Sequence, residues 1–556
     1  MHASRVVSLL SASINKLDLW AARLEARIDD HPRWYLFLFS LFYLSVTLPI
    51  TIIRQMWFDE LITFYTVRFH SLSHLWATLR AGVDMNPPLY HLIVRASETL
   101  LGENELGLRL PSLVAYWVMT VGLYLLARRR VRPLYATLAA LFPLLTMAHD
   151  YASEARPYAI VLACCVLMLL CWQRATEATP RRMALVGLSL SLAVAMCNHY
   201  YASLLVVPIA VGELVRSRDS RKLDWPVWIA LVVGAVPLPF FLPLVRGGMA
   251  AHKDPFVWNK PGLDFLWDTY GELLSYAALP VLLLIAWMFV RSVRNSLRKS
   301  EPRNNGIPDW EIAAGLALCA LPILAFVLAL AWVGMVSPRY VMPTIIGFSI
   351  VLAYTAHSIA GARRATAVLM LAGLTGWSAV HLGLVGRFEL AMLHRFDASD
   401  SERFALGSKL PVIVQDALLE LPMNHYVSPE LRSRMLFPLD LDDVHRYAEI
   451  GSAEKLLMII ARNTFPVPVT DFNQFRRDHK RYLVYGQHAG WLITTVIRDG
   501  ASVRMLYLGR WQILFLVNEK AQEANPAAPA LAAGSPFSHR GSQSAALTRA
   551  RMESHP

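Results

Sequence analysis

Long runs of apolar residues, separated by short polar segments, dominate the chain as far as residue 386. A helix needs about 20 predominantly apolar residues to cross the hydrocarbon core of a bilayer. Eleven runs approach that length, and 55% of all residues are hydrophobic while only 17% are charged. The pattern therefore predicts a polytopic α-helical membrane protein. The eleven predicted spans are residues 34–53, 111–127, 134–148, 157–171, 183–197, 199–215, 226–245, 273–290, 311–335, 340–357 and 366–386.

Two further segments have helical patterns but do not have the pattern of a span. Residues 1–33 are amphipathic, which predicts a helix on the cytoplasmic membrane surface with its arginines towards the lipid headgroups, followed by an uncleaved anchor. The run from Pro87 to Leu101 is short and is interrupted by Arg95 and Glu98, so it predicts an interfacial helix.

The residues after the last span have a different pattern. Four short runs with strand character alternate with helical stretches, so residues 387–520 are predicted to form a small α/β domain. Residues 521–556 are rich in Ala, Pro, Ser and Gly, a composition that predicts a disordered tail. The four predicted strands are Pro411–Val414, Tyr482–Tyr485, Val503–Leu508 and Trp511–Val517.

The formal net charge of +12 comes largely from arginine clusters in every second loop between the predicted spans. Short loops rich in Lys and Arg stay in the cytoplasm, so the N-terminus is predicted to be cytoplasmic and residues 387–520 periplasmic. This distribution argues against nucleic-acid binding, since the clusters are explained by topology. The five cysteines lie inside apolar runs without metal-ligand spacing, and indicate neither a disulfide framework nor a zinc site.

Polar residues with chemical potential gather in the loops that this topology places outside the cytoplasm. Asp59 and Glu60 follow the first span directly, in the first external loop, residues 54–110. An ionisable group this close to hydrocarbon is costly, and is a candidate functional site by default. Four further motifs lie on the same predicted side: Asp84-Met85-Asn86-Pro87-Pro88-Leu89-Tyr90, Leu108-Arg109-Leu110-Pro111-Ser112, Ser153-Glu154-Ala155-Arg156-Pro157-Tyr158 and Ser337-Pro338-Arg339-Tyr340.

These five features, in this order, resemble the dolichyl-phosphate-mannose protein mannosyltransferases and their bacterial relatives, including the aminoarabinose transferase that modifies lipid A, within the GT-C class of membrane glycosyltransferases. The resemblance covers roughly residues 34–350 and departs at Asn86, where relatives carry His or Lys. It implies a GT-C-like transmembrane glycosyltransferase domain over residues 34–386. It also implies transfer of a sugar from a polyprenyl phosphate to a protein, lipid A or polysaccharide acceptor outside the cytoplasm of a bacterial cell.

The resemblance also implies roles for individual residues. Asp59 is the expected general base, with Glu60 as its catalytic neighbour. Arg156 and Arg339 are expected to hold the leaving phosphate, because guanidinium groups bind phosphate in a bidentate manner. A single displacement would invert the anomeric carbon. The remaining candidates for substrate or phosphate binding are Glu154, Tyr340, Arg109, Asn86 and Asp84.

Two further possibilities concern a metal ion and additional contacts to the donor. A divalent cation on Asp59, Glu60 and Asp84 is conceivable, but no dedicated cage of ligands is evident, so no metal is predicted. Lys253, Trp258 and Lys260 lie in another predicted external loop and are candidates for donor contact.

Each candidate also has a structural interpretation. Asp59 could only cap a helix beginning at Glu60. Arg156 could pair with Glu154 and brace a turn, Arg339 could reach the lipid headgroups, and Arg109 could pair with Glu103 or Glu105. For the whole chain, two other functions stay open. A transporter or lipid flippase would use the same charges as a substrate path, and a non-catalytic scaffold would act through the C-terminal domain.

Overall fold

The computed structural model describes residues 2–177, 180–251, 262–297, 306–333, 336–360, 363–393, 405, 407–448, 452–465, 467–487, 490–509 and 512–520. The predicted tail, Lys253, Trp258 and Lys260 lie outside the described residues. The chain divides into two compact units, a helical one and one that contains a β-sheet.

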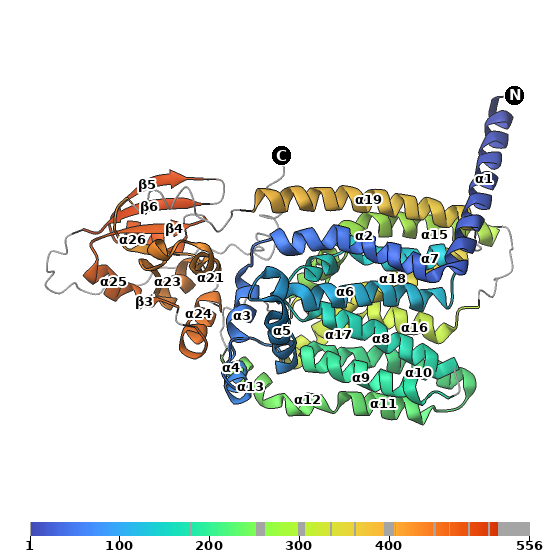
Figure 1. The fold of residues 1–556 in the computed structure, drawn as a ribbon, viewed down its shortest axis with the longest axis horizontal. Helices are drawn as coiled ribbons and strands as arrows, with labels where there is room; N and C mark the ends of the chain where they lie inside the picture. Colours follow the sequence, from blue (N-terminus) through green and yellow to red (C-terminus); the bar gives the residue numbers. More distant parts are fainter. Residues whose placement is uncertain are drawn as a thin grey trace. The chain divides into compact units, whose positions relative to one another are not determined.

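The helical unit consists of α-helices with short 3₁₀ and π segments (Figure 1). Its elements are α1 His2–Asp30, α2 Pro32–Ile53, α3 Phe58–Thr66, α4 Leu72–Arg80, α5 Pro88–Leu101, α6 Glu105–Arg128, α7 Pro133–Leu141, η1 Phe142–Leu145, η2 Met147–Ala152, α8 Tyr158–Glu177, α9 Arg182–Asn198, η3 Tyr200–Leu205, α10 Val206–Ser220, α11 Trp225–Ala235, α12 Pro237–Phe240, α13 Leu242–Ala251, α14 Asp264–Leu274, η4 Ser275–Ala277, α15 Ala278–Leu297, α16 Asp309–Cys319, α17 Leu321–Leu328, η5 Ala329–Val333, η6 Pro338–Val341, α18 Pro343–Ile359 and α19 Arg364–Ala391.

Long helices, bent helix pairs and three shorter apolar helices occupy the predicted apolar runs. Within the described residues, six helices are long and apolar enough to cross a membrane, and two bent pairs bring the number to as many as eight. Three shorter apolar helices, Pro133–Leu145, Arg182–Asn198 and Pro343–Ile359, occupy the other runs. Every predicted span therefore coincides with an apolar helix, while the count of eleven crossings stays a prediction.

The bends and ends of these helices follow from local sequence. The pair α16 and α17 bends by 49° at Ala320, where Pro322 lacks the N–H that a continuous helix would use. The side chain of Asn104 caps α6 by accepting a hydrogen bond from the amide of Gly107 at 2.9 Å. Gly102 ends α5 with a φ of 90°, in the left-handed region that favours glycine.

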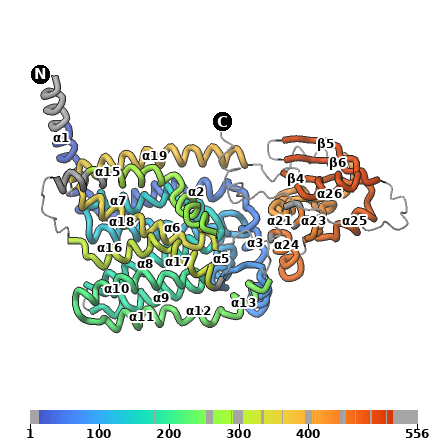
Figure 2. Tube along the Cα trace, turned by 180° about the vertical axis from the view of Figure 1, so that it is seen from behind, coloured from blue at the N-terminus to red at the C-terminus, as the bar shows by residue number. Residues whose placement is uncertain are grey.

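Three short helices between the first two long ones place the candidate site. The chain leaves α2, forms α3, α4 and α5 at one end of the helix bundle, and then enters α6 (Figure 1). The predicted interfacial segment is α5, a helix of 14 residues. Both views show α2 and α19 along one side of the helical unit and α11 with α12 along the opposite side (Figures 1 and 2).

The second unit has a six-stranded sheet in the order β3-β2-β1-β4-β6-β5. In this order, β3, β2, β1 and β4 pair in parallel. The strand β6 pairs antiparallel with β4 on one side and with β5 on the other. Strands lie in all four predicted runs, and β2 and β3 are additional. The elements are β1 Val412–Val414, α21 Ala417–Tyr426, α22 Pro429–Arg432, β2 Met435–Leu439, α23 Leu441–Ala448, α24 Ser452–Asn463, β3 Val469–Asp471, α25 Phe472–Asp478, β4 Arg481–Gly486, α26 Trp491–Arg498, β5 Ser502–Leu508 and β6 Ile513–Asn518.

Candidate active site

The two acidic residues lie in the first turn of α3, but neither is its N-cap. The helix begins at Phe58, and Trp57 is the residue that precedes it. The carboxylate of Glu60 reaches back and accepts a hydrogen bond from the amide of Trp57 at 3.4 Å. The interpretation of Asp59 as the cap of a helix beginning at Glu60 is therefore wrong, because the helix begins two residues earlier.

Glu60 forms a closed ion pair with Arg109 of α6. Two N–H groups of the guanidinium donate to the two carboxylate oxygens, each at 2.7 Å. The other donors reach the backbone carbonyls of Thr51, Arg54 and Gln55 at 2.8, 2.6 and 3.3 Å. Both side chains are 0% exposed. Since guanidinium has five N–H donors and all of them are used, Arg109 joins α2, α3 and α6, and its alternative pairing with Glu103 or Glu105 is wrong.

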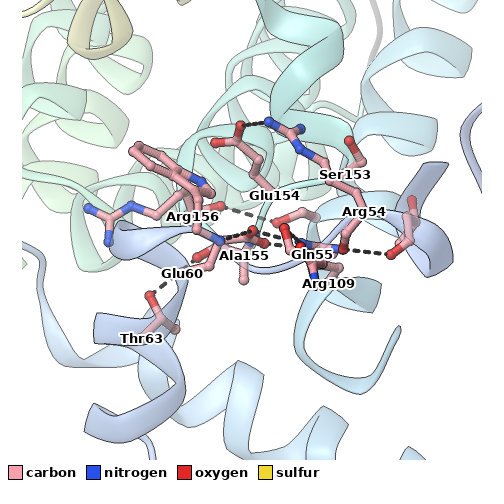
Figure 3. Close-up of polar contacts among 12 residues, drawn as sticks. Arg54, Gln55, Glu60, Thr63, Arg109, Ser153, Glu154, Ala155 and Arg156 are labelled. Atoms are coloured by element: carbon pink, nitrogen blue, oxygen red, sulfur yellow. Dashed lines mark hydrogen bonds and ion pairs between the residues drawn. The ribbon is translucent and has the colours of Figure 1, made fainter. Parts of the chain in front are cut away.

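The segment Ser153–Pro157 is held against α3 and α6 by backbone contacts. Glu60 accepts a hydrogen bond from the amide of Ala155 at 2.8 Å, and Thr63 donates to the carbonyl of Ala155 at 3.2 Å (Figure 3). From α6, the hydroxyl of Ser112 donates to the carbonyl of Arg156 at 3.2 Å. These contacts place the Arg156 guanidinium beside α3.

Arg156 pairs with Asp84, and does not pair with Glu154. Its two terminal nitrogens lie 3.4 and 3.5 Å from the carboxylate oxygens of Asp84. Asp84 also accepts a hydrogen bond from Asn86 at 2.6 Å and contacts His91 at 3.2 Å. Burial alone would raise the pKa of the Asp84 carboxyl, but the Arg156 charge and these two hydrogen bonds outweigh it and hold that pKa well below its usual range.

Glu154 turns the other way, towards Arg54 at the end of α2. The Arg54 guanidinium donates to Glu154 at 2.9 Å and lies 3.5 Å from Glu389 of α19. Figure 3 shows Glu154 and Arg156 pointing in different directions from their shared segment. The alternative interpretation, in which Arg156 pairs with Glu154 and braces a turn, is thus wrong. Sequence reasoning missed Arg54, which belongs to none of the five motifs.

Asp59 is the more open of the two acids. Arg339 donates to its carboxylate at 2.7 Å, and the side chains are 16% and 15% exposed. Arg156 donates to the backbone carbonyl of Asp59 at 3.3 Å. Among the described residues, the Nε of Arg156 is buried without a hydrogen-bond partner. Two guanidinium groups therefore converge on Asp59. The interpretation that Arg339 simply reaches the headgroups is wrong, because it points to Asp59.

A group of aromatic rings includes Tyr340, whose ring centroid lies 6.0 Å from the guanidinium carbon of Arg339. His199 lies 5.3 Å from Tyr158 and 5.2 Å from Tyr340, between ring centroids. Tyr201 lies 4.9 Å from Tyr340, and Tyr151 lies 4.8 Å from Tyr158. We call Tyr151, Tyr158, His199, Tyr201 and Tyr340 the aromatic cluster. Burial, aided by the positive charges of Arg156 and Arg339, lowers the pKa of His199 to about 3.

Most of this cluster was missed by sequence reasoning. Only Tyr340 was named as a site residue, although Asn198-His199-Tyr200-Tyr201 lies in a turn that the charge pattern placed on the same side. That shared side was the available signal. It does not report ring contacts, which form between segments that are distant in sequence.

The acids that were considered as metal ligands each face a different guanidinium. Asp59 contacts Arg339, Glu60 contacts Arg109, and Asp84 contacts Arg156. Over the part of the chain that the structure describes, no group of three or more His, Cys, Asp or Glu side chains could hold a metal ion.

Comparison with known proteins agrees with the motifs. The sequence family described as dolichyl-phosphate-mannose-protein mannosyltransferase matches residues 85–245. The predicted resemblance is confirmed. The matched segment includes the Asp84 partners Asn86 and His91, as well as Arg109 and Arg156, but begins after Asp59. No curated protein matches the sequence.

Solved structures with a similar fold include ArnT from Cupriavidus metallidurans, bound to undecaprenyl phosphate and in the apo state. Each is 14% identical, with a TM-score of 0.52, and the match covers 87% of this chain and 98% of ArnT. The oligosaccharyltransferase AglB from Archaeoglobus fulgidus, in complex with an inhibitory peptide and a dolichol-phosphate, matches at 8% identity and a TM-score of 0.42, over 82% of this chain and 70% of AglB. The match to ArnT shows an ArnT-like fold. The apolar helices and the matching family together indicate a multi-pass membrane protein.

Proposed function

We propose that this protein is a membrane glycosyltransferase that moves a sugar from a polyprenyl phosphate to a hydroxyl or amine of a protein, lipid A or polysaccharide. The reaction takes place on the outer face of a bacterial inner membrane. One observation carries the proposal: Asp59 has a partly exposed carboxylate that accepts from Arg339, and Arg156 donates to the backbone carbonyl of the same residue. The matching family and the fold of ArnT, which was solved with undecaprenyl phosphate, support the donor class.

Asp59 acts as the general base. The acceptor oxygen or nitrogen attacks the anomeric carbon, the bond from that carbon to the phosphate oxygen breaks, and Asp59 takes the acceptor proton. The electron pair of the broken bond leaves with the polyprenyl phosphate. Among the described residues, the other two candidate acids, Glu60 and Asp84, are buried in ion pairs and do not serve as covalent nucleophiles. A single displacement follows, and the anomeric configuration inverts.

Arg156 and Arg339 stabilise the leaving phosphate. Charge-assisted hydrogen bonds from fixed guanidinium groups hold a phosphate strongly, and they cost no reorganisation when they are already in place. Asp84 orients the Arg156 guanidinium, and Asn86 and His91 hold the Asp84 carboxylate in place. The Nε of Arg156, which has no hydrogen-bond partner among the described residues, is a further donor for the phosphate.

Glu60 and Arg109 act through other residues. Because every donor of Arg109 is used and Glu60 has no exposed surface, we assign both as positioning residues that hold α3 and the segment Ser153–Pro157. Glu154 plays the same part for Arg54 at the end of α2. Tyr340 and the other rings of the aromatic cluster lie beside Arg339, where an aromatic face suits the apolar side of a sugar.

The decisive variant is Asp59→Asn, which keeps the size of the side chain but removes the base. General-base assistance contributes about 10²- to 10⁴-fold in rate, so transfer should fall by that factor. Because the donor sugar is unidentified, the readout is mass spectrometry of glycolipids, polysaccharides and secreted proteins from cells that carry the wild type, the variant or no copy. Asp264→Asn, at an exposed position in the first turn of α14, is the matched control.

Two results would contradict the proposal. Full transfer by the Asp59→Asn protein would exclude Asp59 as the base. Identical glycans with and without the wild-type chain, together with coupled ion or lipid flux in vesicles, would instead identify a transporter.

A further inference from the structure

A second cluster of charged residues lies at the other end of the helical unit. The helix α6 begins beside α5 and the candidate active site, and its 24 residues extend about 36 Å to Arg128. That length is close to the thickness of the hydrocarbon core. A cavity of about 490 Å³ opens there. It is lined by Ala22, Glu25, Ala26, Asp29, Arg128, Arg129, Arg130, Val131, Arg132, Pro133, His357 and Arg364.

The amphipathic helix α1 forms one wall of this cavity. Figure 1 shows α1 running across the direction of α2 and α19, as expected for a helix in the membrane interface. Asp18 of α1 accepts a hydrogen bond from the amide of Ala365 at 3.0 Å, in the first turn of α19. Further along α1, Glu25 faces the cavity, and the exposed side chains of Leu19 and Trp20 are available to lipid.

The arginines of the cavity outnumber the acids that pair with them. Glu25 alone accepts from two cations, Arg364 at 2.6 Å and Arg132 at 3.2 Å. Asp29, Glu177 and Glu311 pair with the other three arginines. Among the described residues, these five arginines pair with four carboxylates, so this network of ion pairs has one positive charge in excess. The side chain of Arg132 is 37% exposed, so the excess lies where a ligand can reach it.

Two polar atoms of the lining also have no hydrogen-bond partner within the described residues, the Oε1 of Glu25 and the Nδ1 of His357. A carboxylate oxygen needs a donor, and a ligand hydroxyl is a suitable one. One excess positive charge matches one phosphodiester, which carries a single negative charge. The position at the end of the bundle, beside an interfacial helix, is the level of phospholipid headgroups.

We propose that this cavity binds the headgroup of an anionic phospholipid with hydroxyl groups, its phosphodiester held by Arg132 and Arg364. The bound lipid fixes α1 against α7 and α19. Both arginines shift part of their hydrogen bonding from Glu25 to the phosphate, and Glu25 accepts from the headgroup hydroxyl. The site is independent of the glycosyl-transfer chemistry at the opposite end.

The test uses the full-length purified protein, stripped of lipid in a neutral detergent. Native mass spectrometry counts bound dioleoylphosphatidylglycerol, with dioleoylphosphatidylcholine as the zwitterionic comparison and inorganic phosphate as the soluble competitor. Phosphatidylglycerol should bind preferentially, and inorganic phosphate should not displace it. Equal binding of both lipids would overturn the proposal, and displacement by phosphate would show a soluble-anion site instead.

Variants separate this site from general surface charge. Arg364→Gln and Arg132→Gln should each weaken phosphatidylglycerol binding by about tenfold, the effect of one hydrogen bond to a charged group. Arg363→Gln removes the same charge from the adjacent residue, which does not line the cavity, and should bind as the wild type does. Equal weakening in Arg363→Gln would overturn the proposal.

A variant that is expected to bind the lipid more tightly distinguishes loss of the site from loss of the folded structure. Glu25→Gln removes a carboxylate that competes for Arg132 and Arg364, so phosphatidylglycerol should bind more tightly. Weaker binding in this variant would mean that the cluster is only structural, which would overturn the proposal. Thermal unfolding of each variant identifies any that does not fold, and Arg132→Gln carries the test should Arg364→Gln be one of them.

Discussion

Asp59 and Glu60 are adjacent in the chain, yet their carboxylates lie in opposite kinds of surroundings. Glu60 has no exposed surface, and its partner Arg109 has every donor occupied. Asp59 is partly exposed, its partner Arg339 lies near the Tyr340 ring, and Arg156 donates to the backbone carbonyl of Asp59. A carboxylate and a guanidinium thus form a closed structural pair in one case and an open pair with chemical capacity in the other. Adjacency therefore does not imply a shared role.

The buried pair Glu60–Arg109 and the partly exposed pair Asp59–Arg339 should differ in what they contribute to stability. A fully buried ion pair contributes little net stability, but removal of one partner leaves an uncompensated charge in a dry site. A partly exposed pair is easier to separate, because water and ligands can replace either partner. The closed pair should hence control folding, and the open pair should control activity.

The largest expected effect is on the closed pair. Glu60→Ala leaves Arg109 buried without its counter-ion, which typically costs about 3–5 kcal/mol. We expect a strongly lowered Tm and a poor yield of monodisperse protein, measured by thermal unfolding and size-exclusion chromatography in detergent. Asp59→Ala, one residue away, is the matched variant and should unfold close to the wild-type temperature. Equal Tm values for both variants would remove the distinction between the two pairs.

The open pair should respond in activity. Arg339→Gln removes a guanidinium from the proposed phosphate site, and loss of one such stabilising group lowers the rate by about 10²- to 10³-fold. Glycan transfer by membranes that contain the variant measures this effect, with Arg80→Gln, at an exposed position at the end of α4, as the control. A large fall in Tm with unchanged transfer per folded molecule would assign Arg339 to the structural class instead.

The aromatic cluster should report on the open pair through pH. The pKa of His199 is lowered to about 3 in the folded protein by burial and by Arg156 and Arg339, whereas an unfolded His has a pKa of about 6.5. As the pH falls below about 6.5, the unfolded chain takes up a proton that the folded protein cannot bind, so stability falls.

The variant His199→Gln removes this contribution. Its Tm should decline less than that of the wild type between about pH 7 and pH 5. His149, whose burial lowers its pKa to about 4, remains in both proteins. Thermal unfolding across that range measures the difference, and parallel curves would show that His199 is protonated as easily in the folded state.

Glu420, in the sheet-containing unit, tests a buried carboxyl that has no cation partner among the described residues. Glu420 in α21 is fully buried, and neither of its oxygens has a hydrogen-bond partner among the described residues. Burial raises its pKa to about 8. In the unfolded chain the Glu420 carboxyl ionises above about pH 4.3. Because the folded protein keeps this carboxyl protonated up to about pH 8, the free energy of unfolding decreases as the pH rises over that range.

Glu420→Gln should cancel that loss. The variant is expected to unfold at a higher temperature than the wild type near pH 8 and at nearly the same temperature near pH 4, in the transition of the sheet-containing unit. An equal change of Tm at both pH values would contradict a raised pKa for Glu420 in the folded protein, and destabilisation confined to pH 8 would show that the ionised carboxylate has a partner.

Much of the helical framework was predictable. Every apolar run became a helix, since a bilayer requires continuous backbone hydrogen bonding within each span. Strands also form where short β-branched and aromatic runs predicted them. The strands β2 and β3 were missed because they are short, and β2 contains Pro438, which argues against a strand. The helix boundaries were predicted less accurately. The helix α3 begins at Phe58, whereas one interpretation of the sequence had it begin at Glu60.

The sequence by itself determined which residues can carry charge, which segments are apolar enough for helices, and that five polar motifs belong to one family pattern. The tertiary structure decided the partners. Glu60 pairs with a residue 49 positions away and Asp59 with one 280 positions away, while Glu154 and Arg156, two positions apart, point to different partners. An ion pair needs atoms within a few ångströms, and that distance depends on how helices pack.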